Sequence, residues 1–113
     1  MRILLVDDHG LVREGVALLL RSLDPKIGVH QTADIHDAIA AMRTHGPFDI
    51  VLLDLEMPGM RELDSLHLFR GQFPEQAVVV LSANEDPNTV RRAIDDGAMG
   101  YVKKSLDPAT MMQ

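Results

Sequence analysis

Cysteine is absent from the sequence, which excludes disulfide bonds, thiolate metal sites and a cysteine nucleophile. Long apolar runs are absent too, because the longest ones, such as VALLL and AVVVL, are far too short to cross a bilayer. The first residues, MRILLVDD, place two acids directly after the apolar ones, unlike a secretory signal. The absence of cysteine says little about the compartment, although it fits a reducing cytosol. We expect a cytoplasmic protein that makes no contact with a membrane.

Positive charge is also scarce. The chain has 11 Lys and Arg against 17 Asp and Glu, which gives a formal net charge of -6, and its basic residues are scattered. Such a surface repels phosphate backbones, so these residues alone are not expected to bind nucleic acid. The 113 residues are 46% hydrophobic and 25% charged, which is typical of one globular domain with its own core.

Short runs rich in β-branched residues alternate with longer amphipathic stretches. The runs predict strands at residues 3–7, 28–32, 49–53, 77–81 and 100–102. Between them, apolar residues recur at helical spacing, namely Val12, Val16, Leu19, Leu20 and Leu23, then Ile35, Ala38, Ile39 and Met42, then Leu63, Leu66 and Phe73, and then Val90, Ala93 and Ile94. Asp34 is a candidate N-cap of the second helix, and Gly97 is a candidate end of the fourth.

The alternation of strands and helices predicts an α/β fold with a parallel sheet covered on both faces. Right-handed crossovers and five strands favour the flavodoxin-like (βα)5 three-layer sandwich with strand order 2-1-3-4-5. The last stretch, SLDPATMMQ, begins a fifth helix with Asp107 as its cap and Pro108 in its first turn. Since barely one turn follows, we expect residues 1–113 to be one domain that lacks most of its last helix. The chain would then be the front part of a longer protein.

Polar residues stand at the carboxyl ends of four predicted strands. They are Asp7 and Asp8 after the first strand, Asp54 after the third, Ser82 after the fourth, and Lys103 and Lys104 after the fifth. In open α/β sheets, ligands bind beyond the carboxyl ends of the strands, where the strand order reverses. That point lies between the first and third strands here, so these side chains are expected to converge on one site.

Three carboxylates placed together repel one another, by about 3 kcal/mol for each pair at ~5 Å and an effective dielectric constant of ~20. A divalent ion that prefers oxygen ligands, Mg²⁺ (or Mn²⁺), together with one lysine would balance their charge. Such a site is suited to a phosphoryl group. The metal and the lysine would stabilise its oxygens, the Ser82 hydroxyl could donate to one of them, and Asp54 could attack phosphorus to form an aspartyl phosphate.

Four segments between the first and the last predicted strand match the sequence pattern of a known family. They are ILLVDDHGLVREG, DIVLLDLEMPGM, VVVLSA and GAMGYVKKS. Together they resemble the receiver domain of bacterial two-component response regulators. Within that superfamily, the opening DDH and VREG and the closing GYVKKS resemble the NarL/LuxR-type branch, whose members carry a C-terminal helix-turn-helix. The resemblance implies a DNA-binding domain beyond residue 113, so that DNA would be bound only through that domain.

The resemblance implies a role for each acid. Asp54 would be the phosphoacceptor and a metal ligand. Asp8 would bind the metal directly, Asp7 would bind it through a water molecule, and the backbone carbonyl of Glu56 would be a further ligand.

Other positions match the family's phosphate-binding and switching residues. Ser82 and Lys104 would bind the phosphoryl group, and Ser82 and Tyr101 would form the switching pair. Lys104 matches the family's lysine because it stands four residues after Gly100, and Lys103 would then point to the opposite face of the strand.

The leading hypothesis is a phosphorylation-dependent signalling switch. A sensor histidine kinase would donate a phosphoryl group to Asp54, the Ser82 hydroxyl would move inward, and Tyr101 would fill the vacated space, which shifts an equilibrium between two surface states. The output would be homodimerisation or release of a DNA-binding module beyond residue 113, and through it control of transcription. The chain would catalyse only its own phosphotransfer and autodephosphorylation.

Two other classes of function are also considered. A haloacid-dehalogenase-like phosphatase also forms an aspartyl phosphate, but it requires Asp-x-Asp after the first strand, whereas Asp-Leu-Glu follows the third strand here. A receiver-like interaction module could bind partners without phosphorylation. Such relatives usually lack one of the acids or the lysine, and this sequence has all of them.

Some residues depart from the family or carry no clear signal. Arg61 and Glu62 stand where relatives often have Asp-Gly, so the loop after Asp54 is expected to follow a different path. Glu56 and Asn84 occupy positions that tune phosphate hydrolysis in the family. The histidines share no metal-ligand spacing, and surface roles are expected for all five: His9, His30, His36, His45 and His67.

Overall fold

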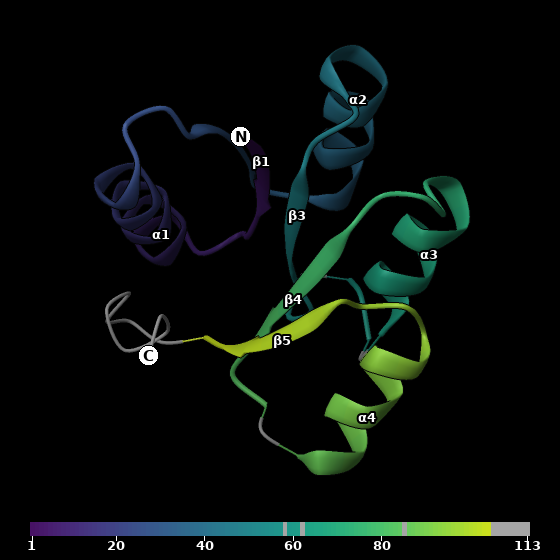
Figure 1. The fold of residues 1–113 in the computed structure, drawn as a ribbon. Helices are drawn as coiled ribbons and strands as arrows, with labels where there is room; N and C mark the ends of the chain where they lie inside the picture. Colours follow the sequence, from purple (N-terminus) through teal and green to yellow (C-terminus); the bar gives the residue numbers. More distant parts are fainter. Residues whose placement is uncertain (58, 62, 85, 105–113) are drawn as a thin grey trace.

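The computed structural model describes residues 1–57, 59–61, 63–84 and 86–104. Strands and helices alternate along these residues, in the order β1 (Arg2–Val6), α1 (Gly10–Leu23), β2 (Gly28–Thr32), α2 (Ile35–His45), β3 (Ile50–Asp54), α3 (Asp64–Gln72), β4 (Val78–Ser82), α4 (Pro87–Asp95) and β5 (Gly100–Lys103). All neighbouring strands are parallel, and the sheet order is β2-β1-β3-β4-β5 (Figure 1). The predicted fold class and strand order are confirmed.

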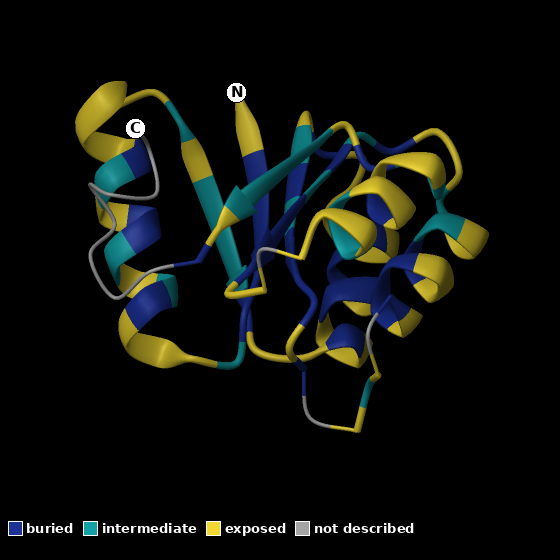
Figure 2. Ribbon diagram, turned by 90° about the horizontal axis from the view of Figure 1, so that it is seen from below, coloured by how far each residue is buried: buried dark blue, intermediate teal, exposed yellow. Residues whose placement is uncertain are grey.

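Helices cover both faces of the sheet, with α1 on one side and α2, α3 and α4 on the other (Figures 1 and 2). Because successive side chains of a strand point to opposite faces, Leu4 and Val6 of β1 pack in the core beneath α2 and α3, while Ile3 and Leu5 pack against α1. Burial on both faces explains why the central strands are apolar at consecutive positions.

Local signals set the ends of two helices. Asp34 caps α2 as predicted, since its Oδ1 accepts a hydrogen bond from the backbone N–H of Asp37 at 2.7 Å. Gly97, which was predicted to end the fourth helix, follows α4 with a φ of 105°, a left-handed conformation that glycine adopts without strain. It turns the chain from α4 toward β5.

Several boundaries and core positions differ from the prediction. β1, β3 and β4 are each shifted by one residue from the predicted range, and β5 extends one residue further. Differences of one residue at a strand end are set by hydrogen-bond pairing, which composition does not reveal. Leu23 and Ile94 were expected in apolar stripes, but they are 62% and 44% exposed. Phe69 is fully buried in α3, whereas Phe73, which was placed in that stripe, is half-buried.

The predicted fifth helix, with Asp107, Pro108, Met111 and Met112, lies outside the described residues, and so does Glu62. In the part of the chain that the structure describes, no helix has both the length and the apolar character that crossing a membrane requires.

Candidate functional site

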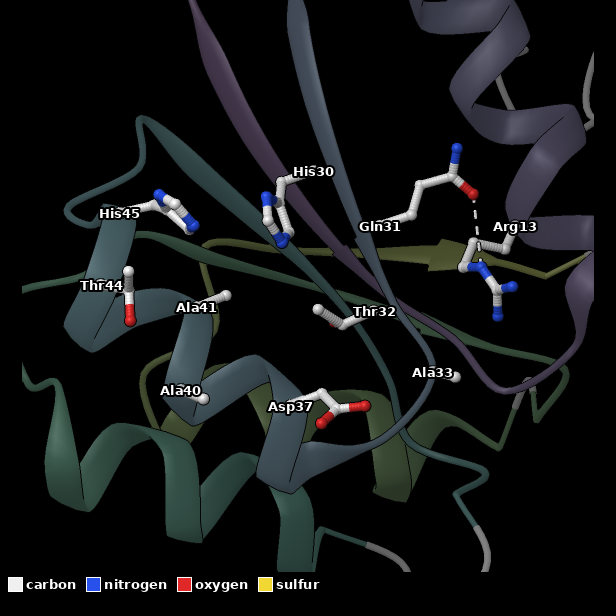
Figure 3. A pocket seen from close by; sticks show the side chains of 10 residues that line it. All are labelled: Arg13, His30, Gln31, Thr32, Ala33, Asp37, Ala40, Ala41, Thr44 and His45. Atoms are coloured by element: carbon white, nitrogen blue, oxygen red, sulfur yellow. Dashed lines mark hydrogen bonds between the residues drawn. The ribbon is translucent and has the colours of Figure 1, made fainter.

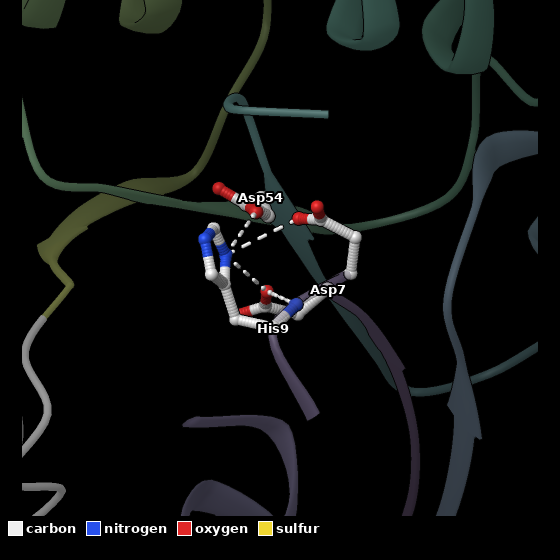
Figure 4. A group of neighbouring side chains, drawn as sticks. Asp7, His9 and Asp54 are labelled. Atoms are coloured by element: carbon white, nitrogen blue, oxygen red, sulfur yellow. Dashed lines mark hydrogen bonds and ion pairs between the residues drawn. The ribbon is translucent and has the colours of Figure 1, made fainter. Parts of the chain in front are cut away.

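Three aspartates meet at the carboxyl ends of β1 and β3. Asp7 and Asp8 follow β1, Asp54 is the last residue of β3, and these two strands are neighbours in the sheet. One potential ligand atom from each of Asp7, Asp8, His9 and Asp54 lies within 4.8 Å of the others. Figure 4 shows Asp7, His9 and Asp54 facing one another. The structure therefore brings together the acids that sequence reasoning placed at one site.

Lys104 supplies positive charge from the end of β5. Its Nζ donates to Asp7 Oδ1 at 3.0 Å and to Asp54 Oδ2 at 2.8 Å. Lys104 is 8% exposed, and Asp7 and Asp54 are 0% exposed, so these charges interact with little water between them. The preceding residue, Lys103, is exposed, as the alternation of side chains along a strand predicts.

His9 belongs to the cluster, although the sequence suggested a surface role for every histidine. Its Nδ1 lies 2.6 Å from Lys104 Nζ and 3.2 Å from Asp8 Oδ1. An ammonium group can only donate, so the short contact between these two nitrogens uses Nδ1 as the acceptor. The ring is 54% exposed, so His9 forms the outer wall of the site. Its position directly after Asp8 was the only signal in the sequence.

Burial sets the ionisation of the two central residues. The pKa of Asp54 is raised from 3.8 to about 6, mainly because the carboxyl is buried. The hydrogen bonds from Lys104 and from the backbone N–H of Glu56 lower this pKa, and the negative charge of Asp7 raises it. Burial alone would lower the pKa of Lys104, but its hydrogen bonds to Asp54 and Asp7 outweigh that effect and raise the pKa above 10.5. Lys104 is therefore the fixed cation of the site.

Two carboxylate oxygens of the cluster fit a metal ion. Asp7 Oδ2 and Asp8 Oδ1 are buried atoms without a hydrogen-bond donor, and a buried acceptor without a donor is unfavourable. A hard divalent cation takes carboxylate oxygens of this kind and keeps water on the rest of its coordination shell. The donor set therefore suits Mg²⁺, in agreement with the expectation from the sequence.

A second group of contacts joins β3 to β4 beside Asp54. The backbone N–H of Glu56 donates to Asp54 Oδ1 at 2.9 Å. The Glu56 side chain turns toward β4, where its Oε1 accepts from the Ser82 hydroxyl at 3.1 Å and from the backbone N–H of Ala83 at 2.9 Å. Sequence reasoning named Glu56 for its carbonyl and for tuning hydrolysis, and it missed this contact with Ser82.

Tyr101 is linked to Ser82 through one residue. Its hydroxyl donates to the backbone carbonyl of Asn84 at 2.6 Å, and the backbone N–H of Asn84 donates to the Ser82 hydroxyl oxygen at 3.0 Å. Tyr101 is half-buried. The two residues implied as a switching pair therefore hold the same short loop from its two sides.

Arg13 supports the cluster from α1. Its Nη1 donates to the backbone carbonyl of Asp7 at 2.7 Å, and its Nε donates to the side-chain oxygen of Gln31 on β2 at 3.3 Å. Arg13 and Gln31 also line an open hollow of about 530 Å³ between β2 and α2 (Figure 3). None of the clustered acids lines that hollow, so we place the chemistry at the aspartates and not there.

Comparison with known proteins agrees with this geometry. Residues 3–113 match the response regulator receiver domain. The chain belongs to this family. This receiver domain is 39% identical over 110 residues to the glycerol metabolism activator of Pseudomonas putida, an alignment that covers 97% of this chain and 50% of the relative. It is 35% identical to the nitrate/nitrite response regulator protein NarP of Escherichia coli, over 99% of this chain and 52% of the relative.

Solved structures support the branch as well as the fold. A LuxR-family two-component response regulator from Aurantimonas is 34% identical, with a TM-score of 0.83 over 99% of this chain and 79% of that chain. The receiver domain of the putative response regulator NarL from Mycobacterium tuberculosis is 32% identical, with a TM-score of 0.77 over 98% and 93%. The resemblance to the NarL/LuxR-type branch is confirmed. The chain spans about half the length of the curated relatives it matches.

Proposed function

We propose that this receiver domain is a phosphorylation-dependent switch whose phosphoacceptor is Asp54. The observation that carries the proposal is the burial of this carboxylate and its contacts with a cation and with the acidic cluster. It is fully buried, its Oδ2 accepts from Lys104 at 2.8 Å, and the cluster that could hold a metal surrounds it. A nucleophile that is fixed in place beside a cation and a metal site has what phosphoryl transfer requires, which is positioning and charge stabilisation.

The donor would be the phosphohistidine of a sensor histidine kinase. An oxygen of Asp54 forms a bond to phosphorus while the phosphorus–nitrogen bond breaks, and the electron pair of that bond goes to the imidazole nitrogen of the kinase. Lys104 stays protonated and donates to a phosphoryl oxygen. Mg²⁺ (or Mn²⁺), when held by Asp7, Asp8, Asp54 and the Glu56 carbonyl, would neutralise charge on the phosphoryl oxygens. Hydrolysis of the aspartyl phosphate would reset the domain, with no other substrate.

Output would begin at Ser82 and Tyr101. A phosphoryl group on Asp54 offers new acceptors to the Ser82 hydroxyl, and Ser82 and Tyr101 both contact Asn84, so a change at Ser82 would reach the surface near β5. We infer a phosphorylation-dependent homodimer and an attached DNA-binding domain beyond residue 113 that controls transcription in the cytoplasm. The names of the relatives, such as transcriptional regulatory protein DegU of Brevibacillus brevis, support this inference.

The test is labelling with acetyl phosphate and Mg²⁺, followed by intact-mass analysis. Acetyl phosphate replaces the kinase, since Asp54 attacks its phosphorus and acetate leaves. We expect one phosphoryl adduct on the wild type, none on Asp54→Ala, and none on the wild type in EDTA. An unmodified wild type, or an equal adduct on Asp54→Ala, would refute the assignment. The receiver-like interaction module would then be the better reading.

A further inference from the structure

The Glu56 carboxylate lies where an anion is expected beside Asp54. One of its oxygens, Oε1, accepts from two donors of different kinds, the Ser82 hydroxyl at 3.1 Å and the Ala83 backbone N–H at 2.9 Å. Two hydrogen bonds from a hydroxyl and an adjacent amide to one oxygen form a small anion-binding seat. Ser82 ends β4, next to the strand that ends in Asp54, so the seat adjoins the phosphoacceptor.

We propose that the Glu56 carboxylate is a built-in competitor of the phosphoryl group, which holds the Ser82 and Ala83 donors until phosphorylation displaces it. This inference rests on the proposed function, because it assigns the regulation of the same site. Glu56 acts through those donors and is a positioning residue, not a catalytic one.

The charges explain why the two anions compete. A phosphoryl group on Asp54 needs donors for its oxygens, and Lys104 is one of them. The Ser82 hydroxyl has one proton, and in the unphosphorylated protein it points to Glu56, while its oxygen already accepts from Asn84. The hydroxyl therefore cannot donate to a phosphoryl oxygen until Glu56 leaves. The negative charge of Glu56 beside the Ser82 hydroxyl also repels the incoming phosphoryl group.

The displacement also links the site to Tyr101. When the Ser82 hydroxyl exchanges Glu56 for the phosphoryl group, the contact between Ser82 and the Asn84 backbone N–H moves with it. Tyr101 holds the other side of Asn84 through its carbonyl. Glu56 would therefore set the position of the loop at Asn84 in the unphosphorylated protein. The strength of its hydrogen bonds to Ser82 and Ala83 would set how readily the domain switches.

The test compares three proteins with the wild type. Glu56→Ala removes the competing acceptor, Glu56→Gln keeps an acceptor of the same shape without the charge, and Glu75→Ala removes an exposed carboxylate before β4, at the opposite end of the sheet. With acetyl phosphate and Mg²⁺, the initial rate of adduct formation is expected to rise by about tenfold in Glu56→Ala, since losing one charge-assisted hydrogen bond changes an equilibrium on this scale. Glu56→Gln should lie between, and Glu75→Ala should match the wild type.

A second measurement needs no phosphoryl donor. The Ala83 amide is protected by Glu56, so its hydrogen exchange, followed by NMR, should accelerate by about tenfold in Glu56→Ala and stay unchanged in Glu75→Ala. Tyr101 is the single tyrosine and the sequence has no tryptophan, so its fluorescence reports on the Asn84 loop and should change only in the Glu56 variants.

The outcomes separate the two proposals. An adduct on the wild type, with an equal or slower rate in Glu56→Ala and unchanged Ala83 exchange, would overturn the role of Glu56 and leave Asp54 as the phosphoacceptor. A wild type without an adduct would overturn both. Faster phosphorylation and faster exchange in Glu56→Ala, with an intermediate Glu56→Gln, would support the competitor.

Discussion

The Asp54 carboxylate is buried, and burial of a charged group predicts that the wild-type domain is less stable than a variant with a neutral side chain at this position. Asp54→Asn keeps the size of the side chain and an acceptor for Lys104, but it removes the ionisable group. In the folded protein the pKa of Asp54 is about 6, against 3.8 for an ordinary carboxyl. Each tenfold change in proton affinity corresponds to about 1.4 kcal/mol, so ionised Asp54 destabilises the fold by up to about 3 kcal/mol.

The sign of the pH dependence follows from that pKa. Because the folded state holds the proton of Asp54 more tightly than the unfolded chain, protonation favours folding. The penalty is absent below about pH 3.8, grows as the pH rises, and is complete above about pH 6. The advantage of Asp54→Asn over the wild type should therefore be close to zero at pH 4 and reach about 2 to 3 kcal/mol at pH 7.5.

Urea unfolding in EDTA, followed by circular dichroism, measures this difference. With an m-value of about 1.5 kcal/mol per molar urea, the midpoint of Asp54→Asn should lie about 1 to 2 M above that of the wild type at pH 7.5. Asp95→Asn removes an exposed carboxylate at the end of α4 and should shift the free energy of unfolding by less than about 0.5 kcal/mol. A variant at Asp54 that is less stable than the wild type, or a difference independent of pH, would contradict the reasoning.

Three further outcomes are expected. Asp8→Asn, which removes the negative charge of the carboxylate whose Oδ1 has no donor, should weaken Mg²⁺ binding by roughly tenfold or more in isothermal titration calorimetry, and an unchanged affinity would place the metal elsewhere. Asp34→Ala removes the cap of α2 and should lower the free energy of unfolding by about 1 kcal/mol, whereas Asp34→Asn should lose much less. Gly97→Ala should destabilise by about 1 to 3 kcal/mol in the same urea assay, because its φ is 105° and an added Cβ would lie 2.7 Å from Arg70 Nε. Wild-type stability in that variant would mean that the backbone relaxes there at no cost.

The sequence was sufficient for the fold because its signals are periodic and local. The apolar central strands β1, β3 and β4, together with the helical stripes between the strands, leave one favoured strand order. That order in turn brings the ends of β1 and β3 together, so the sequence alone is enough to group Asp7, Asp8 and Asp54. Lys104 could be distinguished from Lys103 because adjacent residues of a strand face opposite ways.

The parts that sequence reasoning missed depend on side-chain direction across the site. His9 shares no spacing with another ligand, and only the turn after β1 points its Nδ1 at Lys104. Glu56 is exposed on its loop, and only the approach of Ala83 and Ser82 gives its carboxylate two donors. Leu23 was misplaced because it is the last residue of α1, and a helical stripe does not reveal where the buried part of the helix ends.

The destabilisation at Asp54 and the hold of Glu56 have a common physical basis. The fold collects negative charge at one edge of the sheet and supplies, among the described residues of the cluster, a single lysine to balance the three aspartates. A bound cation stabilises a site with excess negative charge more than it stabilises a neutral site, because the cation offsets the repulsion between the carboxylates in the folded state. Binding of Mg²⁺ should therefore stabilise the wild type more than Asp54→Asn. On the proposed function, the same imbalance would oppose transfer of a phosphoryl group until a cation is bound, so the domain would respond to its donor only when the charge of the site has been neutralised.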